Sequence, residues 1–241
     1  MFEEMEPIEF EHAGTLLRGY AAHPATTGPV PAVLVMHSAV GVAHGVNEPI
    51  ARKLADQGYL AVCTDMFGAH LEGVSLEDAW VELGQIRADP DQQRARTVAW
   101  FDEVARRSDV DETAVAAIGF CYGGTTVLEL ARSGADLKAA VSYHGVVTTH
   151  APAEPGTVPG HVVVYHGARD PFVSLADVDQ FRDEMQHAGV DYQVTVFGTA
   201  AHGFTDPDAA SMQLDGVVYD QLANDLSWNG TIALLRHAFG R

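Results

Sequence analysis

Short apolar runs alternate with longer amphipathic stretches along this chain. Apolar runs without regular polar interruption are typical of strands buried on both faces of a sheet. We predict strands at six such runs: 31–36 (PAVLVM), 59–64 (YLAVCT), 114–120 (AVAAIGF), 139–143 (AAVSY), 161–166 (HVVVYH) and 192–197 (YQVTVF). Strands that alternate with helices imply right-handed crossovers and a parallel sheet. The pattern therefore predicts the α/β class, with a mostly parallel central sheet flanked by helices on both faces.

The stretches between these runs carry the periodicity and the end signals of helices. The predicted helices cover residues 47–57, 75–88, 91–107, 125–132 and 174–187, and most of 211–239. Asn47 is expected to cap the first helix, and Gly58 and Gly189 lie just past two helix ends, where glycine is favoured. Segment 68–90 is also compatible with a lid over a site instead of a core helix.

The length and composition fit one domain. The chain has 241 residues, of which 47% are hydrophobic, so it can bury one substantial core, and disorder of its bulk is excluded. Domains average about 150 residues, but single α/β domains of the present size are common. The chain contains no linker, internal repeat or low-complexity tract. We therefore expect residues 1–241 to form a single domain.

The charge balance limits the classes of partner. Asp and Glu number 33 and Lys and Arg number 14, which gives a net charge of −19. Such a chain repels phosphate backbones and anionic lipids, so we expect no nucleic-acid or membrane partner. No apolar run is long enough to predict a membrane span. Whether the protein is a monomer or a homodimer is left open by the sequence.

The N-terminal segment and the cysteine content bear on the compartment. The first ten residues (MFEEMEPIEF) are acidic and lack the apolar core of a signal peptide, so a cytoplasmic protein is expected. The two cysteines, Cys63 and Cys121, make neither a disulfide framework nor a zinc cluster. Cys63 lies within a predicted buried strand and is expected to be inert.

Twelve histidines raise the question of a metal site. His37, His44 and His70 lie in loops near the predicted edge of the sheet, and His166 lies close to Asp170. No pair has the short spacing of a common metal-binding motif, so ligands would have to come from distant loops. We therefore expect no metal ligands.

The sharpest local motif is 119–124 (GFCYGG), where a predicted strand ends and a helix begins. It matches the G-x-nucleophile-x-G elbow, with Cys121 in place of serine. Glycines are needed beside so sharp a turn, because a Cβ atom there would clash. The turn would place the sulfur at a helix N-terminus, which favours a thiolate. The alternative interpretation is a glycine-rich turn around a small buried cysteine.

Two more candidates follow strands further along the chain. Asp170 follows the predicted strand 161–166, and His202 follows the strand 192–197. The order nucleophile, acid, histidine is that of α/β-hydrolases. In a parallel sheet all three residues would lie at the carboxyl edge, where ligands bind.

These positions predict a role for each residue in acyl transfer. The Cys121 thiolate would attack a carbonyl, His202 would carry the proton to the leaving group, and Asp170 would orient the imidazole. The oxyanion would be bound by the backbone N–H groups of Tyr122 and of Ala39, in the loop after the strand 31–36.

Four segments together resemble the dienelactone hydrolase family: 119–124 (GFCYGG), 167–171 (GARDP), 200–204 (AAHGF) and 56–67 (DQGYLAVCTDMF). The resemblance covers nearly the whole chain and includes the segment 227–229 (SWN), at the expected start of the last helix. It implies an α/β-hydrolase fold and a Cys-His-Asp triad that hydrolyses esters and lactones without a cofactor. Members of this family include carboxymethylenebutenolidases, which open dienelactones.

Two positions depart from the family pattern. The resemblance implies a glutamate after the first strand that helps to generate the thiolate, but Ser38 stands there and cannot act as that base. It also implies an arginine four residues after the catalytic histidine, but that residue is Asp206, which would repel an anionic substrate. Arg87 is the nearest candidate for a second family arginine. We therefore expect a neutral ester or lactone as the small-molecule substrate.

Other residues are candidates for the wall of the site. Ser38 and Asp206 are expected to contact the substrate because of the positions described above. Phe67, Tyr143 and His144 lie just after predicted strands, where they would line the pocket or pack in the core.

Two alternatives remain open at this point. The departures at Ser38 and Asp206 are also compatible with a non-catalytic binder or sensor of small molecules on the same fold. The same nucleophile could also serve acyl transfer or thioester hydrolysis.

Overall fold

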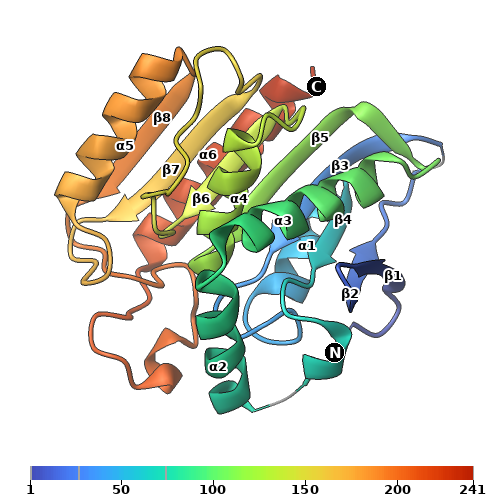
Figure 1. Cartoon of the computed structure of the whole chain (residues 1–241), viewed down its shortest axis with the longest axis horizontal. Coiled ribbons are helices and arrows are strands. Elements are labelled where there is room, and N and C mark those ends of the chain that lie inside the picture. The colour runs from blue at the N-terminus through green and yellow to red at the C-terminus, as the bar shows by residue number, and fades with distance from the viewer. Residues whose placement is uncertain (1, 27, 74, 241) are drawn as a thin grey trace.

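The computed structural model describes residues 2–26, 28–73 and 75–240. Its strands form one sheet in the order β1-β2-β4-β3-β5-β6-β7-β8. The pairs β1–β2 and β2–β4 are antiparallel, and the remaining pairs are parallel. The strands are β1 (Glu6–His12), β2 (Thr15–Ala22), β3 (Val30–Met36), β4 (Leu60–Thr64), β5 (Val110–Phe120), β6 (Ala139–Tyr143), β7 (His161–Gly167) and β8 (Tyr192–Phe197). Figure 1 shows the sheet running through the molecule, from the hairpin of β1 and β2 at one edge to β8 at the other.

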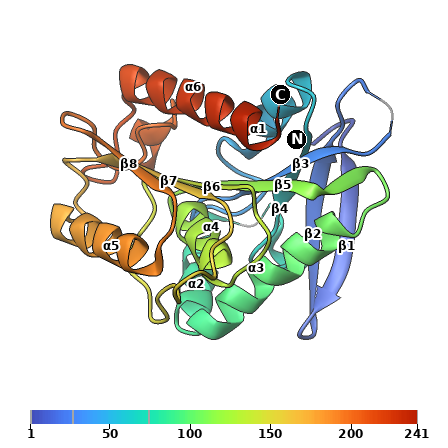
Figure 2. The ribbon, with the colours of Figure 1, turned by 90° about the horizontal axis from the view of Figure 1, so that it is seen from above.

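Helices cover both faces of this sheet. The helices are α1 (Asn47–Asp56), α2 (Leu76–Arg87), α3 (Pro90–Ala105), α4 (Tyr122–Arg132), α5 (Leu175–Ala188) and α6 (Gln221–Ala238), with short 3₁₀ turns η1 (Ala69–Leu71) and η2 (Ala209–Met212). Seen along the sheet, α1 and α6 lie on one face, and α3, α4 and α5 lie on the other (Figure 2). This arrangement confirms the predicted α/β class, with a mostly parallel sheet flanked by helices on both faces.

The side-chain alternation of the central strands explains the two apolar layers. Along β3, Leu34 packs into the core on the side of α3 and α4, whereas its neighbours Val33 and Val35 pack on the side of α1 and α6. Both faces of β3, β4 and β6 are fully buried. Continuous apolar runs are needed for strands of this kind, and for this reason the sequence pattern located them.

The sequence did not predict the N-terminal hairpin of β1 and β2. The two strands pair antiparallel at the edge of the sheet, and most side chains of β1 are exposed or half-buried. A strand with one solvated face carries charged residues at alternate positions, so no apolar run marks it.

The prediction for the C-terminal region was wrong in its first half. Helix α6 begins at Gln221 and is capped by Asp220, and only η2 within the preceding segment is helical. Residues 227–229 therefore lie inside the helix and not at its start. Gly216 has a φ of 78°, and its carbonyl oxygen accepts a hydrogen bond from the His202 N–H at 2.9 Å. This contact and the isolated bridge between His202 and Val217 tie the segment to the loop of His202.

The prediction that Asn47 caps α1 was wrong. Val46 occupies the N-cap position, and Asn47 is buried in the first turn. Its side-chain amide donates hydrogen bonds to the carbonyl oxygens of Gly41, Val42 and His44, at 3.3, 3.1 and 2.8 Å. Asn47 therefore fixes the loop that follows β3, which carries Ser38 and Ala39.

Segment 68–90 forms η1 and α2 in the described residues. Ser75 caps α2 by accepting a hydrogen bond from the Asp78 N–H, and Asp89 caps α3 in the same way through Gln92. The helix lies beyond the carboxyl edge of the sheet (Figure 1). In the described part of the chain, no helix is long and apolar enough to cross a membrane.

Gly123 in the first turn of α4 sets how closely this helix approaches β3. A Cβ atom at Gly123 would lie 2.1 Å from the Met36 carbonyl oxygen, whereas a Cβ atom at Gly84 of α2 would meet nothing within 4 Å. We expect Gly123→Ala to lower the free energy of unfolding by about 3 kcal/mol or more, because backbone would have to move. The matched variant Gly84→Ala should raise it by up to about 1 kcal/mol. Urea denaturation measures both, and a Gly123→Ala protein as stable as the wild type would contradict this account.

Candidate active site

A sharp turn between β5 and α4 presents Cys121. The residue has φ 54° and ψ −114°, a strained conformation for a side chain larger than glycine. A Cβ atom at Gly119 would lie 2.1 Å from the Gly123 carbonyl oxygen, so the strand and the helix can meet only if Gly119 has no side chain. We refer to residues 119–124 as the cysteine turn. Cys121 itself is partly exposed, on the wall of a cavity.

Asp170 and His202 lie beside this turn. His202 Nδ1 is 2.7 Å from Asp170 Oδ2, and both side chains are buried. The other carboxylate oxygen of Asp170 accepts hydrogen bonds from the N–H groups of Phe172 and Val173, at 2.8 and 3.3 Å. A carboxylate held in this way fixes the imidazole with Nδ1 protonated and directs Nε2 toward the Cys121 sulfur, to which His202 is hydrogen bonded.

The cysteine and histidine stabilise each other as an ion pair. Burial raises the pKa of the Cys121 thiol, but the hydrogen bond and charge of His202 and two backbone N–H groups outweigh burial, so the pKa lies below its ordinary value. Burial lowers the pKa of His202, but Asp170 and Cys121 raise it to about 10. Both shifts favour the thiolate–imidazolium form of the pair over the neutral thiol and imidazole.

The two backbone donors at the sulfur are the N–H groups of Tyr122 and Ala39. Tyr122 begins α4, and Ala39 lies in the loop after β3. Two backbone N–H groups that point at one position can also bind the oxygen of a tetrahedral intermediate. The structure thus brings both predicted oxyanion donors to the predicted nucleophile.

His37 has a structural position next to this loop. Its Nδ1 donates a hydrogen bond to the Ser38 carbonyl oxygen at 2.6 Å, and its Nε2 accepts one from the Met66 N–H at 3.0 Å. Both ring nitrogens are therefore engaged in holding the loop after β3 against the segment after β4.

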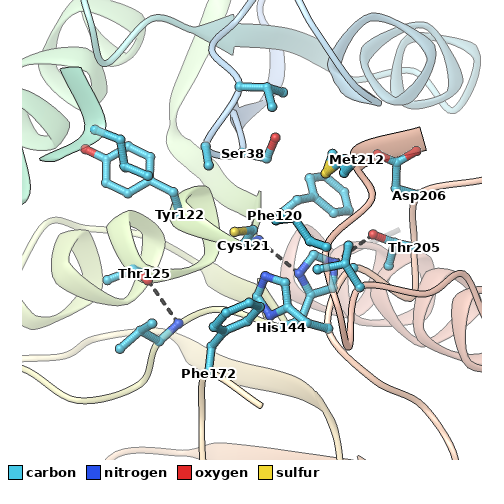
Figure 3. A pocket seen from close by; sticks show the side chains of 18 of the residues that line it. Ser38, Phe120, Cys121, Tyr122, Thr125, His144, Phe172, Thr205, Asp206 and Met212 are labelled. Atoms are coloured by element: carbon cyan, nitrogen blue, oxygen red, sulfur yellow. Dashed lines mark hydrogen bonds between the residues drawn. The ribbon is translucent and has the colours of Figure 1, made fainter. Parts of the chain in front are cut away.

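The cavity above Cys121 has a volume of about 310 Å³. Ser38 and Asp206 lie in its wall, as expected from the sequence, and Arg87 reaches it from α2. Six further apolar side chains of the wall come from three segments that the sequence did not connect: Trp80 and Leu83 of α2, Phe172 after β7, and Met212, Leu214 and Val217 after β8. Figure 3 shows Ser38 and Asp206 across the cavity from Phe172.

Phe67 and Tyr143 do not line this cavity. Phe67 is buried behind it, where its ring packs on His37 and Tyr122. Tyr143 is buried on the face covered by α6, and its hydroxyl is hydrogen bonded to Thr231. The next residue, His144, does reach the cavity, as does Thr205, which the sequence did not mark at all.

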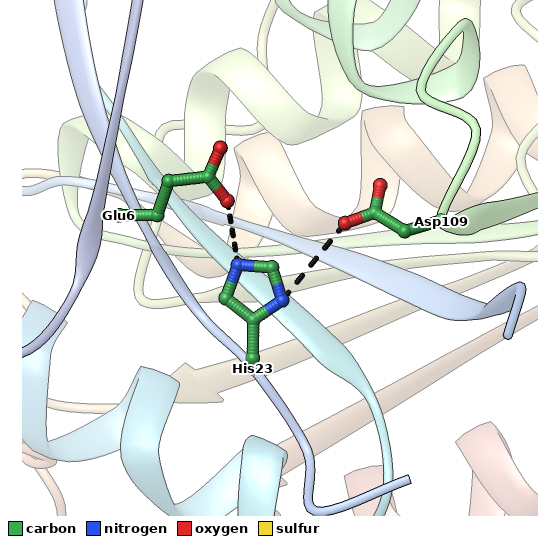
Figure 4. Close-up of side chains that lie close together, drawn as sticks. All are labelled: Glu6, His23 and Asp109. Atoms are coloured by element: carbon green, nitrogen blue, oxygen red, sulfur yellow. Dashed lines mark hydrogen bonds and ion pairs between the residues drawn. The ribbon is translucent and has the colours of Figure 1, made fainter. Parts of the chain in front are cut away.

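The histidines that raised the question of metal binding do not gather at one place. Within the described residues, the one set of histidine, cysteine and acidic side chains close enough to share an ion is Glu6, His23 and Asp109 (Figure 4). Arg107 contacts both carboxylates, at 3.0 Å from Glu6 and 2.8 Å from Asp109. One guanidinium bridges the two carboxylates, so the cluster is an exposed ion-pair network between the N-terminal strands and β5.

Known proteins resemble this chain over most of its length. The sequence profile of the dienelactone hydrolase family matches residues 17–239. A protein of Yersinia pestis that is provisionally named a carboxymethylenebutenolidase is 29% identical over 203 residues, which cover 79% of this chain and 75% of that protein. An uncharacterised protein of Caenorhabditis elegans is 37% identical over 137 residues, which cover 54% of this chain and 84% of that protein.

The fold has a close counterpart among solved structures. A crystal structure of a dienelactone hydrolase-like promiscuous phosphotriesterase from metagenomic libraries superposes with a TM-score of 0.90. It is 34% identical in sequence, and the match covers 98% of each chain. The chain therefore belongs to the dienelactone hydrolase family and is a hydrolase of the lactonase and esterase type.

Proposed function

We propose that the protein hydrolyses small neutral esters or lactones through a triad of Cys121, His202 and Asp170. The observation that carries the proposal is the convergence of three hydrogen-bond donors on one sulfur atom. The imidazole of His202, held by Asp170, and the N–H groups of Tyr122 and Ala39 all meet at the Cys121 sulfur. A buried structural cysteine would have no need of this set of partners.

The reaction would take two steps. The thiolate attacks the ester carbonyl carbon, and the N–H groups of Tyr122 and Ala39 bind the resulting oxyanion. As the C–O bond breaks, His202 Nε2 gives its proton to the leaving oxygen, which leaves a thioester on Cys121. His202 then takes a proton from water, the hydroxide attacks the thioester, and the thiolate leaves as the carboxylic acid is released. Both charges of the ion pair are then restored.

The substitution of Ser38 for a glutamate fits this mechanism. A glutamate at this position would be needed only if the thiol required a further base. His202 and the two N–H groups already hold the pKa of Cys121 below its ordinary value. Activation of the nucleophile therefore rests on the triad itself, and the Ser38 hydroxyl serves as a polar part of the wall.

The wall of the cavity supports a neutral substrate. Asp206 lies in the wall with one oxygen bound to the Asp208 N–H at 2.9 Å, and no ion pair to Asp206 is formed within the described residues. Arg87 reaches the wall from α2, so beside the Cys121–His202 pair the wall carries one further charge of each sign. Trp80, Phe172 and Leu214 are 45%, 56% and 40% exposed and give the mouth an apolar rim. Such a site binds apolar groups and gives a carboxylate near Asp206 no net attraction.

A second substrate class is suggested by the similar metagenomic protein, a promiscuous phosphotriesterase. The oxyanion donors Tyr122 and Ala39 would suit a phosphoryl oxygen as well as a carbonyl oxygen, and a phosphotriester is also neutral. Assays with a phosphotriester beside the esters decide whether the same cavity accepts both.

Replacement of the nucleophile tests the chemistry. We expect Cys121→Ala to reduce turnover of p-nitrophenyl acetate by about a thousandfold or more, with the fold retained, because no other thiolate faces the cavity. The matched variant Cys63→Ala changes a cysteine buried in β4 and should leave kcat/KM unchanged. Unchanged turnover in Cys121→Ala would refute the proposal. Ligand-induced thermal stabilisation of a wild type that turns over no ester would instead favour a non-catalytic small-molecule binder. Products formed with added alcohols or thiols would instead show acyl transfer.

The pH dependence tests the ion pair. The pKa of Cys121 is held below its ordinary value and that of His202 is raised to about 10, so the pH range in which thiolate and imidazolium coexist is widened at both ends. We expect kcat/KM for an alkyl ester to be flat around neutral pH and to fall as the pH rises through about 10, where His202 loses the proton needed by the leaving group. Asp170→Asn should move this alkaline limb to lower pH. A limb that does not move would show that His202 is not the titrating group.

Charge selection at the wall tests the substrate class. We expect the wild type to prefer p-nitrophenyl butyrate over mono-p-nitrophenyl succinate, and Asp206→Asn to narrow the ratio of the two kcat/KM values by about fivefold, since one repulsive charge is removed. The exposed neighbour Asp208 provides the control variant Asp208→Asn, which should leave the ratio unchanged. A wild-type preference for the carboxylate-bearing ester would refute the assignment of a neutral substrate.

A further inference from the structure

We propose that His144 is a positioning residue that ties the cysteine turn to the loop carrying His202. The inference rests on the proposed function for its consequence in turnover, but its geometry can be tested on the cysteine alone. His144 follows β6 directly and is buried between the two segments that supply the nucleophile and the base.

Two hydrogen bonds of the His144 ring reach these two segments. Nδ1 accepts a hydrogen bond from the Cys121 N–H at 3.1 Å, and Nε2 lies 2.9 Å from Thr205 Oγ1 (Figure 3). An imidazole nitrogen that accepts from an N–H carries no proton, so the proton lies on Nε2 and is donated to Thr205. The ring is thus a neutral tautomer with one bond to the nucleophile's own backbone and one to a residue three positions after His202.

The backbone of His144 is built to place this ring. Its φ is 42°, a left-handed conformation that is costly for histidine. The His144 N–H donates to the Tyr165 carbonyl oxygen of β7 at 2.8 Å, and a Cβ atom on Gly145 would lie 2.6 Å from the Gly124 carbonyl carbon. Strain that persists between two tightly packed strands and a close helix is characteristic of functional positions.

The surroundings keep the ring uncharged. Burial lowers the pKa of His144 well below its ordinary value, and the nearby charge of His202 lowers it further. The two imidazole rings lie with their centroids 5.0 Å apart, at 63° to one another. The titratable groups around His144 are Cys121, His202 and, on β7, His166. A second cation beside the His202 imidazolium would be repelled, so a neutral ring here leaves the thiolate–imidazolium pair intact.

The position of the sulfur depends on these bonds. Cys121 is strained, and its N–H is shared between the Tyr143 carbonyl oxygen at 2.9 Å and His144 Nδ1. If the turn relaxes, the sulfur moves away from His202 and from the N–H groups that stabilise its negative charge. Because Thr205 lies in the same loop as His202, loss of its bond moves the base as well. One ring therefore fixes the distance between nucleophile and base from both sides.

The experiment measures the reactivity of Cys121 with iodoacetamide as a function of pH in a Cys63→Ala background. His144→Phe keeps the ring and its packing against Phe204 and removes both hydrogen bonds. We expect the apparent pKa of alkylation to rise by about one unit and kcat for an ester to fall about tenfold, with KM changed less than about twofold. Thr205→Val, which removes one bond, should cause a smaller shift in the same direction, and Thr205→Ser should restore the wild-type profile.

Each result either supports or overturns the positioning role of His144. A folded His144→Phe protein with a wild-type alkylation profile overturns the proposal. The same holds if only its thermal stability falls, because a residue that merely packs in the core would have that effect. If His144→Phe does not fold, the contrast between Thr205→Val and Thr205→Ser takes its place, and equal profiles for these two overturn the proposal. A wild type that hydrolyses no ester would refute the proposed function alone, because the alkylation profile still reports the position of the sulfur.

Discussion

The close approach of α4 to the carboxyl ends of β3 and β5 is the constraint on which the site depends. Cys121 can stand at a strained φ only because Gly119 and Gly123 allow strand and helix backbones to touch. The same approach sets the Tyr122 N–H beside the Ala39 N–H, because the loop that holds Ala39 continues from β3. The geometry of the nucleophile and that of the oxyanion donors are therefore one property of the packing, and not two independently built features.

The electrostatics of the site are local and differ from those of the whole chain. The net charge of −19 is spread over the molecule, and many acidic side chains on the surface are paired with arginines, as in the network of Arg107. At Cys121, by contrast, an imidazolium and two N–H groups act on a partly buried sulfur, where little water screens them. The pKa values of Cys121 and His202 move in opposite directions for this reason, despite an acidic protein around them.

The sequence predicted the parts of the fold and site that are determined by neighbours along the chain. Continuous apolar runs located β3 to β8, and the glycines of the cysteine turn marked Cys121 because local backbone sterics require them. The hairpin of β1 and β2 was not predicted, because an edge strand with a solvated face has no apolar run. Asn47 was predicted to cap a helix, but its side-chain amide donates hydrogen bonds to three carbonyl groups of a loop. Which of these two roles Asn47 takes depends on how that loop folds back.

Tyr143 and His144 show why the wall of the site could not be derived in the same way. Both follow an apolar run, and the sequence treated them alike. Alternation along β6 directs Tyr143 to the face of α6, and regular continuation would direct the next side chain to the opposite face. The positive φ of His144 breaks that continuation and turns its ring toward Cys121. This conformation is maintained by contacts of β7 and α4, which come together only in the folded sheet, so tertiary packing decides here which of two adjacent aromatic rings reaches the site.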